Sequence, residues 1–167
     1  MSERRRTLHE AMILFTVGDT RFAIAASAVE EIRSRDGLEP LASVRGRTAG
    51  VRHTLERRGR SHFVIESDMH FCMLPTKLER VLVLRGNSAA ILVGRIDRMH
   101  EIHTLYSLPR AFRGEERRWY RGLALLRDGV VPVIDPATFV DKAEWIRQSL
   151  PGAAGRDNVV TMPGVAV

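Results

Sequence analysis

Two groups of metal-ligating side chains occur in short stretches of this sequence. His100, Glu101 and His103 form the first, and the second alternates along the chain as Asp68, His70 and Cys72. A zinc-protease signature needs its histidines four residues apart on a helix, but the second histidine here follows after three, in a segment typical of a strand. The alternating group would share one face of a strand, yet no second cluster completes a four-coordinate site. We therefore predict no metal site.

Catalytic patterns of other kinds are also missing. Cys72 has no recognisable partner for nucleophilic chemistry, and the sequence contains neither a Gly-x-Ser-x-Gly elbow nor a phosphate-binding loop. Glu30 and Glu31 are adjacent carboxylates, but neighbours on a helix diverge by about 100°. They are better interpreted as an exposed acidic patch than as an acid/base pair. The sequence thus predicts a protein that binds without catalysing a reaction and without a cofactor.

Arginines concentrate in residues 45–60, within a chain of 167 residues and net charge +6. They are Arg45, Arg47, Arg52, Arg57, Arg58 and Arg60. Clustered arginines neutralise nucleic-acid phosphates, but this stretch has no aromatic residue on which a base could stack. Two other interpretations are a solvated hairpin and a surface that docks on an acidic protein. We favour these two together.

The elements that must position these residues are repeated. Residues 12–24 and 80–93 each consist of two apolar runs separated by a Gly-containing turn, about 70 residues apart, which is a hairpin pattern. Each is followed by a similar phrase, Val29-Glu30-Glu31-Ile32 and Met99-His100-Glu101-Ile102. Each half then closes with a Gly-marked hairpin, at residues 50–66 and 122–135.

This repeat predicts a mainly β fold of two small five-stranded barrels packed side by side. We expect a single domain over residues 12–150, with one lobe near 12–75, the other near 80–135, and a helix over 136–150. Asp135 is a suitable N-cap for this helix, and Pro136 suits its first position. Residues 27–33 are expected to form a short helical turn, and residues 68–74 a continued strand. Residues 1–11 are predicted to be flexible and 151–167 disordered.

The cellular compartment follows from features that are missing. Cys72 is the sole cysteine, so no internal disulfide is possible. The apolar stretch after the basic N-terminus is too short for a signal peptide, and no segment reaches the length of about 20 apolar residues that crosses a bilayer. We expect a cytoplasmic protein.

Several phrases resemble those of CheW-like domains, in the same order and over residues 12–147. Residues 119–135 resemble the closing phrase of that family, in which a Tyr and an Arg-Gly precede two apolar strands and a final Asp. Residues 13–24 resemble its opening, Val29 to Ile32 its "Val-x-Glu-Ile" phrase, and residues 93–99 the phrase that follows the second hairpin.

The resemblance implies a scaffold without enzymatic activity, built of two barrels with a hydrophobic groove between them. It implies two partners, the regulatory domain of a CheA-like histidine kinase and the cytoplasmic tip of a methyl-accepting chemoreceptor, and no small-molecule substrate. The family phrase "Gly-Val-x-Asn-Leu-Arg-Gly" is altered in residues 50–59, where one residue is extra and the Asn is missing. An adaptor for a different sensory or motility pathway therefore stays open, as does a basic β-barrel that binds nucleic acid through residues 45–60. The resemblance assigns partner binding to Val29, Glu31, Arg58 and Gly59.

Overall fold

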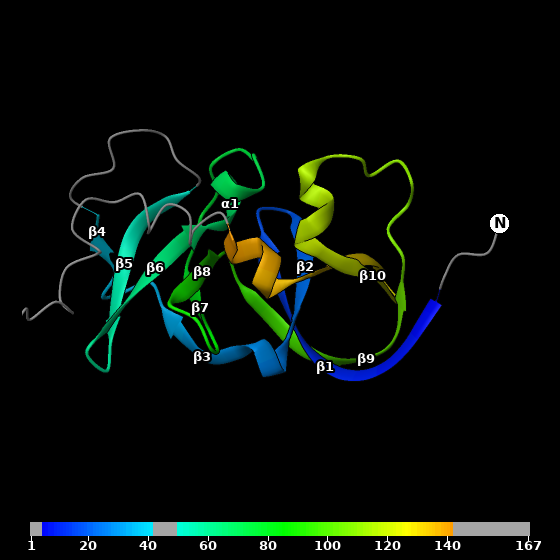
Figure 1. Cartoon of the computed structure of the whole chain (residues 1–167), viewed down its shortest axis with the longest axis horizontal. Coiled ribbons are helices and arrows are strands. Elements are labelled where there is room, and N and C mark those ends of the chain that lie inside the picture. Colours follow the sequence, from blue (N-terminus) through cyan, green and yellow to red (C-terminus); the bar gives the residue numbers. More distant parts are fainter. Residues whose placement is uncertain (1–4, 42–49, 142–167) are drawn as a thin grey trace, which may run out of the picture.

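Strands form most of the regular structure. The computed structural model describes residues 5–41 and 50–141 (Figure 1). Its first strands are β1 (Arg5–Val17), β2 (Thr20–Ala25), β3 (Val29–Ser34), β4 (Glu39–Pro40), β5 (Val51–Arg57) and β6 (Arg60–Glu66). The later ones are β7 (Arg80–Leu84), β8 (Ala89–Val93), β9 (Ile96–Tyr106), β10 (Tyr120–Leu126) and β11 (Gly129–Ile134). Short helical turns are η1 (Ala26–Ala28), α1 (Ser67–His70) and η2 (Glu115–Trp119), and residues 136–141 are helical.

The strands form two sheets. A closed barrel has the strand order β1-β2-β11-β10-β9, and a six-stranded sheet has the order β3-β7-β8-β6-β5-β4. The predicted mainly β fold is confirmed, with one five-stranded barrel as expected and a six-stranded sheet in place of the second barrel. In Figure 1 this sheet lies to the left of the barrel strands β1, β2, β9 and β10.

The two copies of the repeat exchange strands. The first hairpin, β1–β2, pairs with β9 and β11 of the second copy, and the hairpin β7–β8 pairs with β3 and β6 of the first. Each sheet is therefore built from one copy's first hairpin together with the third strand and last hairpin of the other copy. This corrects the predicted division into lobes at 12–75 and 80–135, because the repeat unit is not the folding lobe.

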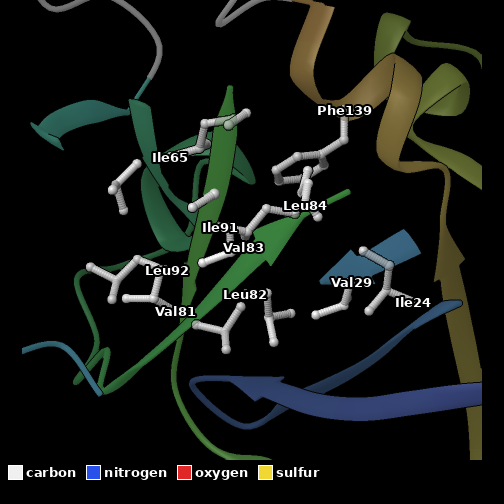
Figure 2. Close-up of a cluster of buried hydrophobic side chains, with 14 of the residues drawn as sticks. Ile24, Val29, Ile65, Val81, Leu82, Val83, Leu84, Ile91, Leu92 and Phe139 are labelled. Carbon is white, nitrogen blue, oxygen red and sulfur yellow. The ribbon is translucent and has the colours of Figure 1, made fainter. Parts of the chain in front are cut away.

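The exchange places β1 and β2 between two cores, so both of their faces are buried. Met12 and Leu14 point into a small cluster inside the barrel, while Ile13 and Phe15 point into the larger cluster shared with the six-stranded sheet. Alternate residues of a strand face opposite sides, which explains why this segment is a continuous apolar run. Figure 2 shows the shared core, where Ile24 and Val29 lie with strands β7 and β8 and with Phe139.

Three local predictions differ from the structure. Residues 5–11, expected to be flexible, form the start of β1, because they pair along β9. Residues 27–33 turn once at η1 and then continue as β3, since that segment pairs with β7. Residues 67–70 are helical, so the alternating group Asp68, His70 and Cys72 does not share a strand face. Residues 142–150 of the expected helix and the predicted tail 151–167 lie outside the described residues.

Candidate functional site

An ionic cluster joins the edge strand β3 to the end of β5. The guanidinium of Arg57 donates from Nε to the Glu31 carboxylate at 2.6 Å and from Nη2 to the Glu30 carboxylate at 3.0 Å. Arg33 adds a second cation, with its Nε 3.6 Å from Glu31. Only 13% of the Arg57 side chain is exposed. Such charge-assisted pairing fixes a guanidinium in orientation as well as in position.

A bulge allows both carboxylates to reach one arginine. Adjacent strand residues normally point to opposite faces, but the pairing of β3 with β7 slips between Val29 and Glu31. Glu30 is the extra residue of this bulge. A bulge bends the strand and re-aims its side chains, so Glu30 and Glu31 converge on Arg57.

The cluster also links the two sides of the curved six-stranded sheet. Strands β7, β8 and β6 lie between β3 and β5 in the strand order, yet Arg57 of β5 contacts Glu31 of β3 directly. The sheet must therefore curl until its two sides meet at this ion pair. The backbone edge of β3 stays unpaired within the described residues, and Ile32 on it is 42% exposed.

The turn beside the cluster has an unusual backbone. Arg58 and Gly59 connect the paired residues Arg57 and Arg60, with φ values of +48° and +73°. Positive φ at both positions characterises the type I′ hairpin turn, which favours Asn-Gly. Glycine meets this requirement without strain, whereas a side chain at the first position is disfavoured. Arg58 is thus held in a strained conformation at an exposed tip.

We predict that Arg58→Asn stabilises the fold by about 1 kcal/mol, since Asn adopts the left-handed conformation more readily than Arg. The free energy of unfolding in urea measures this effect. Arg60→Asn is the matched control, because Arg60 is exposed in β6 just beyond the turn. A destabilised Arg58→Asn, or an equal gain for Arg60→Asn, would contradict the strain argument.

A polar hollow opens next to the cluster. Its volume is about 480 Å³, and it is lined by Glu30, Arg57, Arg58, Arg60, His62, Gly86, Asn87 and Ser88. The turn between β5 and β6 supplies one wall and the turn between β7 and β8 the other. Charged and amide groups around an open hollow suit a polar segment of another protein better than an apolar small molecule.

Electrostatics favour the charged forms of Glu31 and Arg57. The hydrogen bond from Arg57, followed by the charges of Arg57, Arg33 and Arg58, lowers the pKa of Glu31 below its ordinary value. The bond to Glu31 likewise raises the pKa of Arg57. The pKa of Glu31 is lower in the folded protein than in the unfolded chain, so the ionised carboxylate stabilises the fold at neutral pH. This contribution is lost as the pH falls through the folded pKa.

The interlobe seam is filled by aromatic side chains. The Phe71 ring stacks on Phe22 at 4.4 Å, and the His70 ring lies 3.9 Å from Phe139 and 4.3 Å from Trp119 between ring centroids. These rings join α1, the barrel and helix 136–141. These aromatic side chains thus contribute to packing between the barrel and the six-stranded sheet.

Asp68 has a structural role in the same region. Its carboxylate accepts hydrogen bonds from the backbone N–H groups of Met69 at 2.7 Å and Thr76 at 3.0 Å. This occupies the carboxylate oxygens and shapes the loop after α1. We therefore interpret Asp68 as a loop-fixing residue.

A comparison with protein-family models decides the family. The CheW-like domain model matches residues 11–144, which is most of the chain. The chain belongs to the CheW-like domain family. The resemblance noted in the sequence is thereby confirmed.

A solved structure supports the same fold. The scaffolding protein TtCheW from Thermoanaerobacter tengcongensis matches with a TM-score of 0.67 and 12% sequence identity, covering 80% of this chain and 94% of that chain. No curated protein sequence was found to match. None of the helices within the described residues of this CheW-like domain is long and apolar enough to cross a bilayer.

The residues to which the family resemblance assigns partner binding lie around the ionic cluster, and one of them is buried. Glu31, Arg58 and Gly59 are at the cluster and its turn. Val29 is 7% exposed and belongs to the shared core (Figure 2). We therefore assign Val29 to the support of β3 rather than to direct contact.

Two members of the cluster were missed by sequence reasoning. Arg57 pairs with Glu31, and Glu30 shares the same guanidinium, whereas the resemblance assigned partner binding to neither Arg57 nor Glu30. The alternation of β5 carried a signal, because Arg57 stands two residues after the buried Leu55 and so shares its face. A helical turn would point Glu30 and Glu31 in different directions, so this expectation gave no reason to look for one arginine that pairs with both.

Proposed function

We propose that this CheW-like protein is a non-enzymatic adaptor of a chemotaxis-type signalling system. It couples the cytoplasmic tip of a chemoreceptor to the regulatory domain of a CheA-like histidine kinase. Membership of the family over residues 11–144 supports the adaptor role, as does a fold shared with a scaffolding protein. The observation that carries the proposal is the ionic cluster of β3 and β5, which presents a charged turn beside an unpaired strand edge.

The two features act together in docking. The unpaired edge of β3 lies beside the exposed side chain of Ile32, and a free strand edge of this kind suits docking of another domain. The charges of Arg58 and Arg60 at the turn set register and speed encounter with an acidic surface. We assign the kinase regulatory domain as the partner that binds this surface of β3 and the β5–β6 turn.

The nucleic-acid alternative has weaker support. Arg57, one of the arginines of the basic stretch, is already neutralised by Glu30 and Glu31. These carboxylates would also repel a phosphate backbone. No observation in the described residues favours that function over protein docking.

Arg58→Glu tests the proposal. We expect the substitution to weaken binding of the purified kinase regulatory domain by about tenfold, because an exposed charge at a docking surface contributes to encounter and register. Isothermal titration calorimetry gives the Kd, and an unchanged thermal unfolding curve shows that the fold is intact.

The matched control is Arg110→Glu, an equal change of charge at an exposed site between β9 and η2 in the barrel lobe. It should leave the Kd unchanged. Equal binding by wild type and Arg58→Glu would remove this turn from the interface. Absence of binding by the wild type, together with a salt-sensitive gel shift of DNA or RNA, would favour the nucleic-acid alternative instead.

A further inference from the structure

Two histidines far apart in the sequence meet on the exposed surface of the barrel. His9 of β1 and His103 of β9 have their Nδ1 atoms 2.9 Å apart and their ring centroids 4.9 Å apart. Glu101 lies two residues before His103, on the same face of β9. One nitrogen or oxygen from each of His9, Glu101 and His103 lies within 4.8 Å of the other two.

A bulge in the β1–β9 ladder produces this meeting. Thr7 pairs with Thr104 and Glu10 with Ile102, so Leu8 and His9 together stand opposite His103. The extra residue lets Leu8 pack against the barrel core while His9 stays on the outer surface. Bulges commonly re-aim a side chain in this way, and here the bulge brings an imidazole to its counterpart.

The separation of the two nitrogens suits a shared ion. Bonds of about 2.0–2.1 Å from each nitrogen to zinc, with the nitrogens at their observed separation, subtend an angle of about 90° at the ion. Widening this angle toward the tetrahedral value requires only a small side-chain movement. Without an ion, one imidazole must donate a hydrogen bond to the other, which fixes opposite tautomers.

We propose that His9, Glu101 and His103 form a binding site for a divalent transition-metal ion, with Zn²⁺ as the reference ion. Two imidazoles and one carboxylate suit zinc, nickel or copper rather than magnesium or calcium, which prefer all-oxygen ligands. All three side chains are exposed, so further coordination positions are open to water or to a group of a bound partner.

The surroundings provide room for such a group. Glu101 and His103 also line a hollow of about 710 Å³ on the barrel, together with His100, Leu125 and Asp128. Met99 and Leu125 are more than half exposed near these strands. The site is separate from the ionic cluster of the other sheet, so the inference does not depend on the proposed function.

Metal binding to the untagged full-length protein tests the site. We expect calorimetry with ZnCl₂ to show one bound ion per chain. We also expect an excess of 100 times the Kd to raise the midpoint of thermal unfolding by roughly 5–10 °C, because the ion binds the folded state and ties β1 to β9. Co²⁺ should give the visible absorption bands of a nitrogen-containing site.

Variants decide whether these three residues hold the ion. His9→Ala and His103→Ala should each weaken binding at least tenfold, and Glu101→Gln should weaken it less. His100→Ala is the matched control, since His100 is exposed on the same strand but outside the cluster, and it should bind as wild type. No saturable binding by a folded wild type, or equal losses for His100→Ala and His103→Ala, would overturn the proposal.

Discussion

Replacing Arg57 with Glu is expected to weaken binding of the kinase regulatory domain by about tenfold to hundredfold, more than any change at the exposed turn. Among the described residues, Arg57 is the only one whose side chain forms ion pairs with both Glu30 and Glu31, and the substitution removes it. It also places a third carboxylate beside them. The ion pairs of Arg57 with Glu30 and Glu31 link β5 to β3, so we expect β3 and the β5–β6 turn to separate in the variant. The docking surface would then lose both its shape and its charge.

Calorimetric titration of the kinase domain into wild type and variant measures this loss. The matched control is Arg52→Glu, because Arg52 is exposed on the same strand β5 and has no ion pair within the described residues. A double variant, Arg57→Glu with Glu31→Arg, should recover part of the affinity by restoring opposite charges. Full affinity in Arg57→Glu would show that the cluster is not part of the interface.

Removing the Phe139 ring is expected to have the largest effect on stability. Phe139 is fully buried, its ring lies 3.9 Å from His70 and 5.5 Å from Phe71 between centroids, and it belongs to the shared core (Figure 2). Truncating a buried phenylalanine to alanine costs about 3–5 kcal/mol, through lost burial and the cavity left behind. For a chain of this length, that lowers the unfolding midpoint by roughly 6–20 °C.

Thermal and urea unfolding of Phe139→Ala check this expectation. Phe112→Ala is the matched control, because Phe112 is 37% exposed and should cost far less. A loss for Phe139→Ala no greater than that of Phe112→Ala would mean that helix 136–141 does not depend on the shared core. A large loss would confirm that the seam between the lobes is a structural element.

The hairpins of this protein could be predicted from local patterns. Residues 12–24 and 80–93 show their apolar runs and Gly turns in the sequence, and both form hairpins in the structure. The sequence likewise predicts a Gly-marked hairpin over residues 50–66, which the structure forms from β5 and β6. These features depend on interactions between neighbours in the chain, so a single sequence contains the information needed to find them.

Pairing between the copies could not be predicted. Strand β3 pairs with β7, and β9 pairs with β1, although each could have paired with its own preceding hairpin without any change of apolar pattern. The two copies have the same periodicity, so the pattern alone does not distinguish exchange from separate lobes. In the folded chain, strand exchange buries both faces of β1 and β2 in two cores, and this burial favours exchange over separate lobes.

The mainly β class, the repeated hairpins, the family resemblance and the Gly-marked hairpin 50–66 all follow from the sequence. Strand β3 of the candidate site does not, because the pattern of residues 27–33 predicts a helical turn. The pairing of Arg57 with Glu30 and Glu31, and the meeting of His9 with Glu101 and His103, are visible in the folded chain alone. Both groups have the same cause. Each depends on a bulge and on a contact between distant strands, which are set by the packing of the whole chain and not by the residues next to them.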